Sequence, residues 1–146
     1  MSKPVPFELT MEVRDACLCL HAQRAARALA RRFDEALRPH GLTNGQFSLL
    51  MTLNRPEPPA IGPVARFLAM DRTTLTAALK PLERDGLVTI TPDQNDRRSR
   101  LLALTRKGHK TLADAIPAWR TTHAAVEAEL GDMQPEALRA ALRALG

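Results

Sequence analysis

The 146-residue sequence has no tyrosine and only two cysteines, Cys17 and Cys19. So few cysteines argue against a disulfide framework, and we expect both to be free thiols. No run of about 18 apolar residues occurs, and the first ten residues lack the basic-then-apolar order of a signal peptide. These absences exclude an evident membrane span or secretion signal, so we expect a cytoplasmic protein.

Signatures of catalysis are also missing. The sequence contains no Gly-rich phosphate loop, no paired-carboxylate signature and no Ser/His/Asp set that can be placed together. Cys17 and His21 form an i, i+4 pair, but no third metal ligand lies nearby in the sequence. We therefore expect no enzymatic activity, no cofactor and no metal.

Positive charge is concentrated in the middle of the chain, which is long enough for one domain with a real core. The net charge is +5, and residues 71–110 carry nine basic and five acidic side chains. Residues 111–146 carry three basic and five acidic ones. A basic stretch of this kind suits a phosphate backbone, although a solvated surface has a similar composition.

Helical periodicity and cap residues divide the first half of the chain. Apolar residues at helical spacing predict one long helix over 11–38, ended by Pro39 and Gly41. A second helix is expected to start at Thr43 or Asn44 and to stop at "NRPEPPA". A short third helix is expected over roughly 62–69.

The second half predicts a helix, a hairpin and two further helices. Asp71 is the expected N-cap of "RTTLTAALKPLERDG", in which Gly86 ends the helix and Pro81 bends it. "LVTI" and "RLLAL" are short β-prone runs, and Thr105 is expected to cap a long helix that precedes a terminal one. This order predicts a mainly α protein with a small β-hairpin (α+β), that is, a winged helix-turn-helix.

Two segments carry the candidate DNA-binding residues. The helix that follows Asp71 offers donors and methyl groups for base edges in the major groove, although solvated threonines on an ordinary amphipathic helix would look the same. At the hairpin tip the arginines would repel one another unless an anion met them, and Asp96 is expected to hold Arg98 extended through an ion pair. The candidates are Arg72, Thr73, Thr74, Thr76, Lys80, Asp96, Arg97, Arg98 and Arg100.

The hairpin stretch "DGLVTITPDQNDRRSRLLALTRKG" resembles the wing signature of the MarR family of bacterial transcriptional regulators. "LTNGQFSLL" and "MDRTTLTAALKPLERDG" resemble its second helix and recognition helix, so the similarity covers nearly the whole chain. Asn95 stands where the family usually has arginine. The matching wing positions are Gly86, Leu87, Val88, Asp93, Asp96, Arg98, Leu102, Leu104, Thr105 and Gly108.

The resemblance implies a regulator that binds double-stranded operator DNA. Residues 1–146 would form a single MarR-like domain, with dimerisation helices in 11–38 and 105–146 and a winged helix-turn-helix lobe over about 43–104. A homodimer would meet successive major grooves of a pseudo-palindromic operator, most simply as a repressor.

The family resemblance also implies a signal that releases DNA, either a small aromatic or phenolic ligand or oxidation of a cysteine. For a ligand, we expect a mostly apolar pocket, although the aromatic residues among its candidates could equally be core. For redox sensing, Cys19 and secondarily Cys17 are candidates, although hydroperoxide-sensing members use tyrosines that this chain lacks. The pocket candidates are His21, Arg24, Phe47, Met51, Trp119 and His123.

Overall fold

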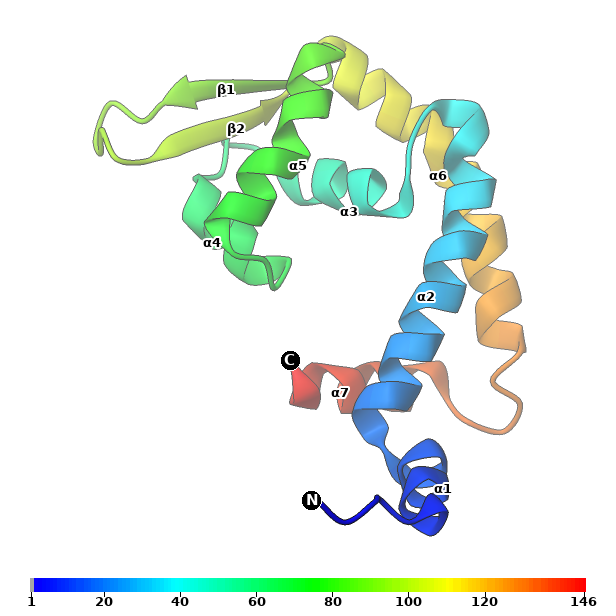
Figure 1. The fold of residues 1–146 in the computed structure, drawn as a ribbon. Helices are drawn as coiled ribbons and strands as arrows, with labels where there is room; N and C mark the ends of the chain where they lie inside the picture. Colours follow the sequence, from blue (N-terminus) through cyan, green and yellow to red (C-terminus); the bar gives the residue numbers. More distant parts are fainter. Residues whose placement is uncertain (1) are drawn as a thin grey trace.

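Two long helices lie side by side as a stalk that carries a lobe at one end (Figure 1). The computed structural model describes residues 2–146, and it confirms a mainly helical chain with one antiparallel hairpin. The stalk helices are α2 (Leu18–Leu37) and α6 (Arg106–Ala128). The lobe contains α3 (Asn44–Leu53), α4 (Ile61–Phe67), α5 (Arg72–Arg84), β1 (Val88–Pro92) and β2 (Arg100–Leu104). At the far end of the stalk, Figure 1 places α1 (Phe7–Ala16), α7 (Pro135–Leu145) and both termini.

The first helix differs from the single helix predicted over 11–38. It is divided at Cys17, whose backbone is extended (ψ 109°), so α1 ends at Ala16 and α2 begins at Leu18. The Cys17 thiol accepts the Leu20 N–H at 3.4 Å and acts as the N-cap of α2. The helical spacing of apolar residues continues through this break. A thiol that accepts a backbone N–H in place of a carbonyl does not change that spacing, so the sequence pattern does not show the break.

Leucine side chains dominate a core that extends from the lobe to the adjoining ends of α2 and α6. Thr43 caps α3 and forms a reciprocal capping box with Gln46, as the sequence predicted for the helix start. The third helix begins at Ile61 and ends at Phe67, slightly earlier than predicted. The largest fully buried side chains are Leu37, Leu49, Leu50, Val64, Leu75, Leu79, Leu82, Val88 and Leu102.

The hairpin is anchored on a third segment that the sequence did not reveal. Val88 pairs with Leu104 and Pro92 with Arg100, and the Leu102 N–H donates to the Pro59 carbonyl at 2.9 Å. Proline suits this edge because its carbonyl can accept a hydrogen bond and it has no backbone N–H that needs an acceptor. The proline-rich connector therefore holds the base of the hairpin. Among residues 2–146, no helix has the length and apolar character needed to cross a bilayer.

Two residues with positive φ set the entry to and exit from α5. Gly86 (φ 76°) ends α5, and the Leu87 N–H donates to the Leu82 carbonyl at 2.9 Å. Ala69 (φ 54°) makes the equivalent turn after α4, where the Met70 N–H donates to the Ala65 carbonyl. A non-glycine residue in this conformation is strained, so the turn between α4 and α5 stores a small cost.

Candidate nucleic-acid interface

Helix α5 presents a polar face outward and an apolar face to the core. The Asp71 carboxylate accepts the Thr74 N–H at 2.7 Å, and this hydrogen bond holds the pKa of Asp71 below its usual range. Pro81 lies within the helix, which nevertheless continues to Arg84. Leu75, Leu79 and Leu82 are buried. The exposed residues include Arg72, Thr73, Thr74, Thr76 and Lys80, so the five recognition-helix candidates share accessible surface.

The wing tip is shaped by two aspartates that bond to backbone. Asp93 Oδ1 accepts the Asn95 N–H at 2.9 Å, and Asp96 Oδ1 accepts the Arg98 N–H at 3.0 Å. The expected ion pair between Asp96 and the Arg98 guanidinium is therefore not formed within residues 2–146. Asp96 acts through an Asx turn, because a carboxylate two residues before an N–H reaches it more readily than it reaches a long guanidinium. Asp96 therefore orients the backbone of Arg98 and does not hold its guanidinium.

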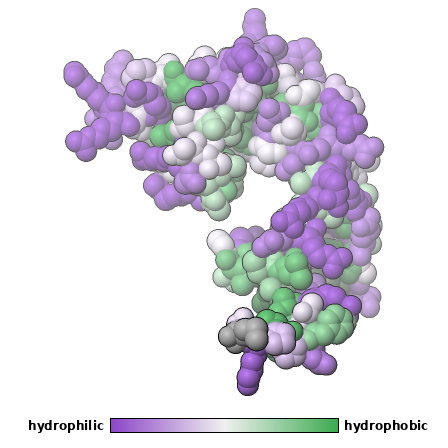
Figure 2. Space-filling view, in the orientation of Figure 1, coloured by the Kyte–Doolittle hydropathy of each residue, from purple (hydrophilic) through white to green (hydrophobic). Residues whose placement is uncertain are grey.

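The three tip arginines differ in their partners. Arg100 Nη1 donates to the carbonyls of Arg97 and Ser99 at 3.2 and 3.1 Å, so part of its guanidinium is used to close the loop. Arg97 and Arg98 are exposed, and neither side chain has a salt-bridge partner in the described part of the chain. Their charges face solvent at the end of a hairpin that projects from the lobe, where Figure 2 shows a hydrophilic surface.

Hydrogen bonds and a close approach of two backbone segments connect the wing to the stalk. Thr105 caps α6 by accepting the Gly108 N–H at 2.9 Å, and its hydroxyl donates to the Gly86 carbonyl at 2.6 Å. A Cβ on Gly108 would lie 2.1 Å from the Leu87 carbonyl oxygen. Gly108, one of the motif positions, is thus the residue that lets α6 approach the start of β1.

A second connection joins the stalk to the start of α3. Asp34 of α2 accepts both the backbone N–H and the side-chain amide of Asn44 at 2.7 Å. These hydrogen bonds hold the pKa of Asp34 below its usual range. Sequence reasoning missed this pair, since nothing local indicates which helix end Asp34 reaches. It fixes the lobe relative to α2.

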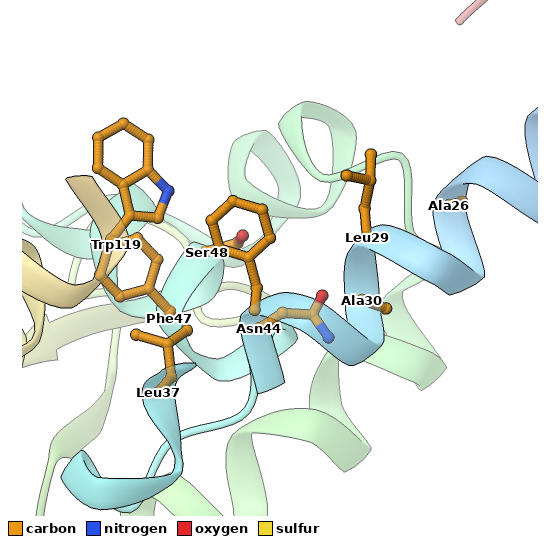
Figure 3. Close-up of a pocket in the computed structure, with 9 residues that line it drawn as sticks. Ala26, Leu29, Ala30, Leu37, Asn44, Phe47, Ser48 and Trp119 are labelled. Atoms are coloured by element: carbon orange, nitrogen blue, oxygen red, sulfur yellow. The ribbon is translucent and has the colours of Figure 1, made fainter. Parts of the chain in front are cut away.

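A partly open cavity of about 190 Å³, lined by both apolar and polar groups, lies where α2, α3 and α6 meet (Figure 3). Phe47 and Trp119 form one wall, with ring centroids 6.2 Å apart, and Leu29 of α2 lies on the opposite side. Asn44 and Ser48 supply its polar groups. A groove of about 410 Å³ shares Phe47, Ser48 and Trp119 and extends to Met51 and Phe67.

The structure brings together only part of the expected pocket. Phe47, Met51 and Trp119 line the cavity or the groove, and His123 stacks on Trp119 with ring centroids 4.8 Å apart. His21 and Arg24 instead line a separate shallow hollow on α2. They lie elsewhere because their positions on α2 are turned away from Ala26, Leu29 and Ala30, which face the cavity.

The two thiols have different surroundings. Cys17 is half-buried at the helix break, whereas Cys19 is exposed and accepts a hydrogen bond from Gln23 Nε2 at 3.0 Å. His21 Nδ1 donates to the Cys17 carbonyl at 2.8 Å. No group of three or more metal-ligating side chains occurs in residues 2–146.

Similar proteins of known sequence are transcriptional regulators. The MarR family model matches residues 42–99. The transcriptional activatory protein BadR of Rhodopseudomonas palustris is 38% identical over 88 residues, which are 58% of this chain and 50% of BadR. The regulator TtmR of Methylorubrum extorquens is 34% identical over 105 residues, or 70% of this chain and 54% of TtmR. The chain thus spans about half the length of these curated relatives.

Solved structures match over most of their length. The M. tuberculosis regulator MosR in complex with DNA is 39% identical, with a TM-score of 0.80 over 88% of this chain and 92% of MosR. The transcriptional repressor CouR, bound to a 23-mer DNA duplex, is 30% identical, with a TM-score of 0.80 over 98% of this chain and 99% of CouR. With this coverage and the family match to the lobe, the chain belongs to the MarR family and has its winged helix-turn-helix fold.

Proposed function

We propose that this protein is a sequence-specific regulator of transcription that binds double-stranded DNA as a homodimer. The observation that carries the proposal is the pairing of an exposed polar face on α5 with an ordered wing tip, at which Arg97 and Arg98 have no carboxylate partner among residues 2–146. Helix α5 would enter a major groove, and the wing arginines would reach the adjacent minor groove. The DNA complexes of MosR and CouR support this assignment.

The homodimer is proposed from apolar surface at the far end of the stalk. Figure 2 shows apolar surface over the end that contains α1 and α7. Phe7, Leu18 and Leu145 are 69%, 73% and 70% exposed. Patches of such residues mark protein contacts, and a second copy of the same helices would cover them. The two-fold symmetry then predicts a pseudo-palindromic operator with half-sites about 34–36 Å apart.

Release of DNA by a small aromatic or phenolic ligand is the regulation that the cavity favours. A cavity of about 150 Å³ is known to accept benzene, so the 190 Å³ space between α2, α3 and α6 has room for one aromatic ring. A ligand there would press on the stalk helices and on α3 together. It would thereby change the spacing of the two lobes, and the protein would act as a ligand-released repressor.

Trp119 offers a direct test of this cavity because it is the only tryptophan in the chain. We expect 4-hydroxybenzoate to quench its fluorescence with saturation. Ala30→Leu, which fills the cavity from α2, should abolish the quenching, whereas Ala25→Leu on another face of α2 should not. Equal quenching in both variants would place the ligand elsewhere.

A thiol-based switch at Cys19 is the second candidate, favoured by the exposure of this thiol beside the helix break at Cys17. Oxidation there would alter the start of α2, within the proposed dimer interface. Hydrogen peroxide should then release DNA from the wild type but not from Cys19→Ser. Equal release from both proteins would exclude the thiol as the switch.

Arg98→Ala tests DNA binding itself. We expect it to weaken binding to a selected duplex by about 1–3 kcal/mol without changing the dimer mass measured by light scattering. Lys3→Ala, which removes one positive charge outside the lobe, is the control and should bind normally. Unchanged affinity of Arg98→Ala at matched salt would contradict the assigned role of the wing.

A further inference from the structure

We propose that Arg66 of α4 and Arg72 of α5 form a clamp for one backbone phosphate of the DNA, seated over Gly62. This inference rests on the proposed DNA-binding function. It adds Arg66 to the interface and changes the role of Arg72 from reading bases to holding the DNA backbone.

Gly62 is the point at which the two arginines meet. It is buried in α4, and a Cβ added to it would lie 3.0 Å from Arg72 Nη2 and 3.6 Å from Arg66 Nη1. Two guanidinium groups from the two helices of the helix-turn-helix therefore lie within 3.6 Å of one position. A side chain larger than a methyl group at Gly62 would occupy this position and displace the Arg72 guanidinium, which already lies 3.0 Å from an added Cβ.

Nothing in the described chain neutralises this pair. Neither Arg66 nor Arg72 takes part in a salt bridge or a side-chain hydrogen bond among residues 2–146. The nearest carboxylate along the chain, Asp71, accepts the Thr74 N–H instead. Two cations held together on an exposed surface repel each other, and an anion between them removes that repulsion. The planar forks of two guanidinium groups match the oxygens of a phosphate.

The position of the pair selects the DNA backbone as the source of that phosphate. Both arginines flank the α4–α5 turn, beside the first turn of the helix proposed to enter the major groove. Guanidinium groups that lie over α4 would be at the edge of the major groove. They would not lie on the exposed face of α5, which is proposed to contact the bases. Contacts to phosphate fix the register of a protein on DNA but carry no sequence information directly.

The test is a salt series on two duplexes, one selected for binding and one unrelated. Each subunit of the proposed dimer contributes one clamp, so Arg66→Ala should lower the slope of log K against log [NaCl] by about 2. Affinity should fall by the same factor on both duplexes, and Arg72→Ala should behave alike. Gly62→Val removes no charge but should reproduce the loss, with circular dichroism showing that the fold is intact. Lys3→Ala is the control for charge.

The outcomes separate the clamp from the proposed function. If the wild type discriminates between the duplexes and Arg66→Ala leaves the slope unchanged, the clamp is wrong and the function stands. A loss confined to the selected duplex would make these arginines readers of sequence and would also overturn the clamp. Failure of the wild type to bind either duplex would overturn both proposals.

Discussion

Gly108 offers the sharpest test of the junction between the wing and the stalk. In Gly108→Ala the new Cβ would lie 2.1 Å from the Leu87 carbonyl oxygen, a distance that real Cβ contacts do not show. Helix α6 and the start of β1 must separate to relieve the contact. That movement loosens two hydrogen bonds, from the Thr105 N–H to the Leu87 carbonyl at 3.0 Å and from the Thr105 hydroxyl to the Gly86 carbonyl at 2.6 Å.

The magnitude follows from three contributions. Overpacking costs about 1–3 kcal/mol, and weakening of the hydrogen bonds adds about 1 kcal/mol. The higher helix propensity of alanine returns about 1 kcal/mol. The net loss is about 2 kcal/mol in the free energy of unfolding, which lowers Tm by about 5–8 °C in a chain of this size.

Thermal unfolding followed by circular dichroism, at one fixed protein concentration, measures this loss. Gly45→Ala is the matched control, because Gly45 lies in α3 and its added Cβ meets no other part of the described chain within 4 Å. We expect the control to be unchanged or stabilised by up to about 1 kcal/mol. A Gly108→Ala protein as stable as the control would refute the packing argument.

Three further substitutions test other parts of the structure. Ala69→Gly should raise the free energy of unfolding in urea by about 0.5 kcal/mol, since it relieves the positive φ at a small entropic cost; destabilisation would contradict the strain. Because folding lowers the pKa of Asp34, the ionised carboxylate contributes to the free energy of unfolding. This contribution is complete above the unfolded-state pKa of about 3.9 and is lost as pH falls through the folded-state pKa. The stability difference between wild type and Asp34→Ala should therefore be constant from pH 7 to about 5 and shrink below about 4; a difference that persists at low pH would contradict this. Asp96→Asn should retain DNA affinity and Asp96→Ala should lose it, because an amide oxygen preserves the Asx turn. Equal loss of affinity by both variants in a gel shift would instead support an ion pair between Asp96 and the Arg98 guanidinium.

Local signals were sufficient to predict the family and the order of elements from α3 onward. Thr43, Asp71 and Thr105 each cap the predicted helix, because a cap depends on a backbone N–H only two or three residues away. The wing residues lie in consecutive positions of one hairpin, so their proximity follows from the strand register.

Features that depend on packing between distant segments were not predictable in this way. No local sequence pattern encodes contacts between segments that are distant along the chain. Three such contacts are the approach of α6 to Leu87, the Asp34–Asn44 hydrogen bonds and the two arginines beside Gly62. The helix break at Cys17 was missed because the helical spacing of apolar residues continues through it and neither glycine nor proline marks it. The role of Asp96 was misjudged for a similar reason, since a carboxylate can meet either a guanidinium or a backbone N–H.

Selection of duplexes from a random library by the wild-type protein tests most directly whether two copies of this lobe read a two-fold-related DNA site. We expect enrichment of two inverted half-sites centred about 10 base pairs apart, bound at least about 10³-fold more tightly than unrelated duplex at physiological salt. Enrichment of no sequence, or equal affinity for selected and unrelated duplexes across the salt range, would contradict it.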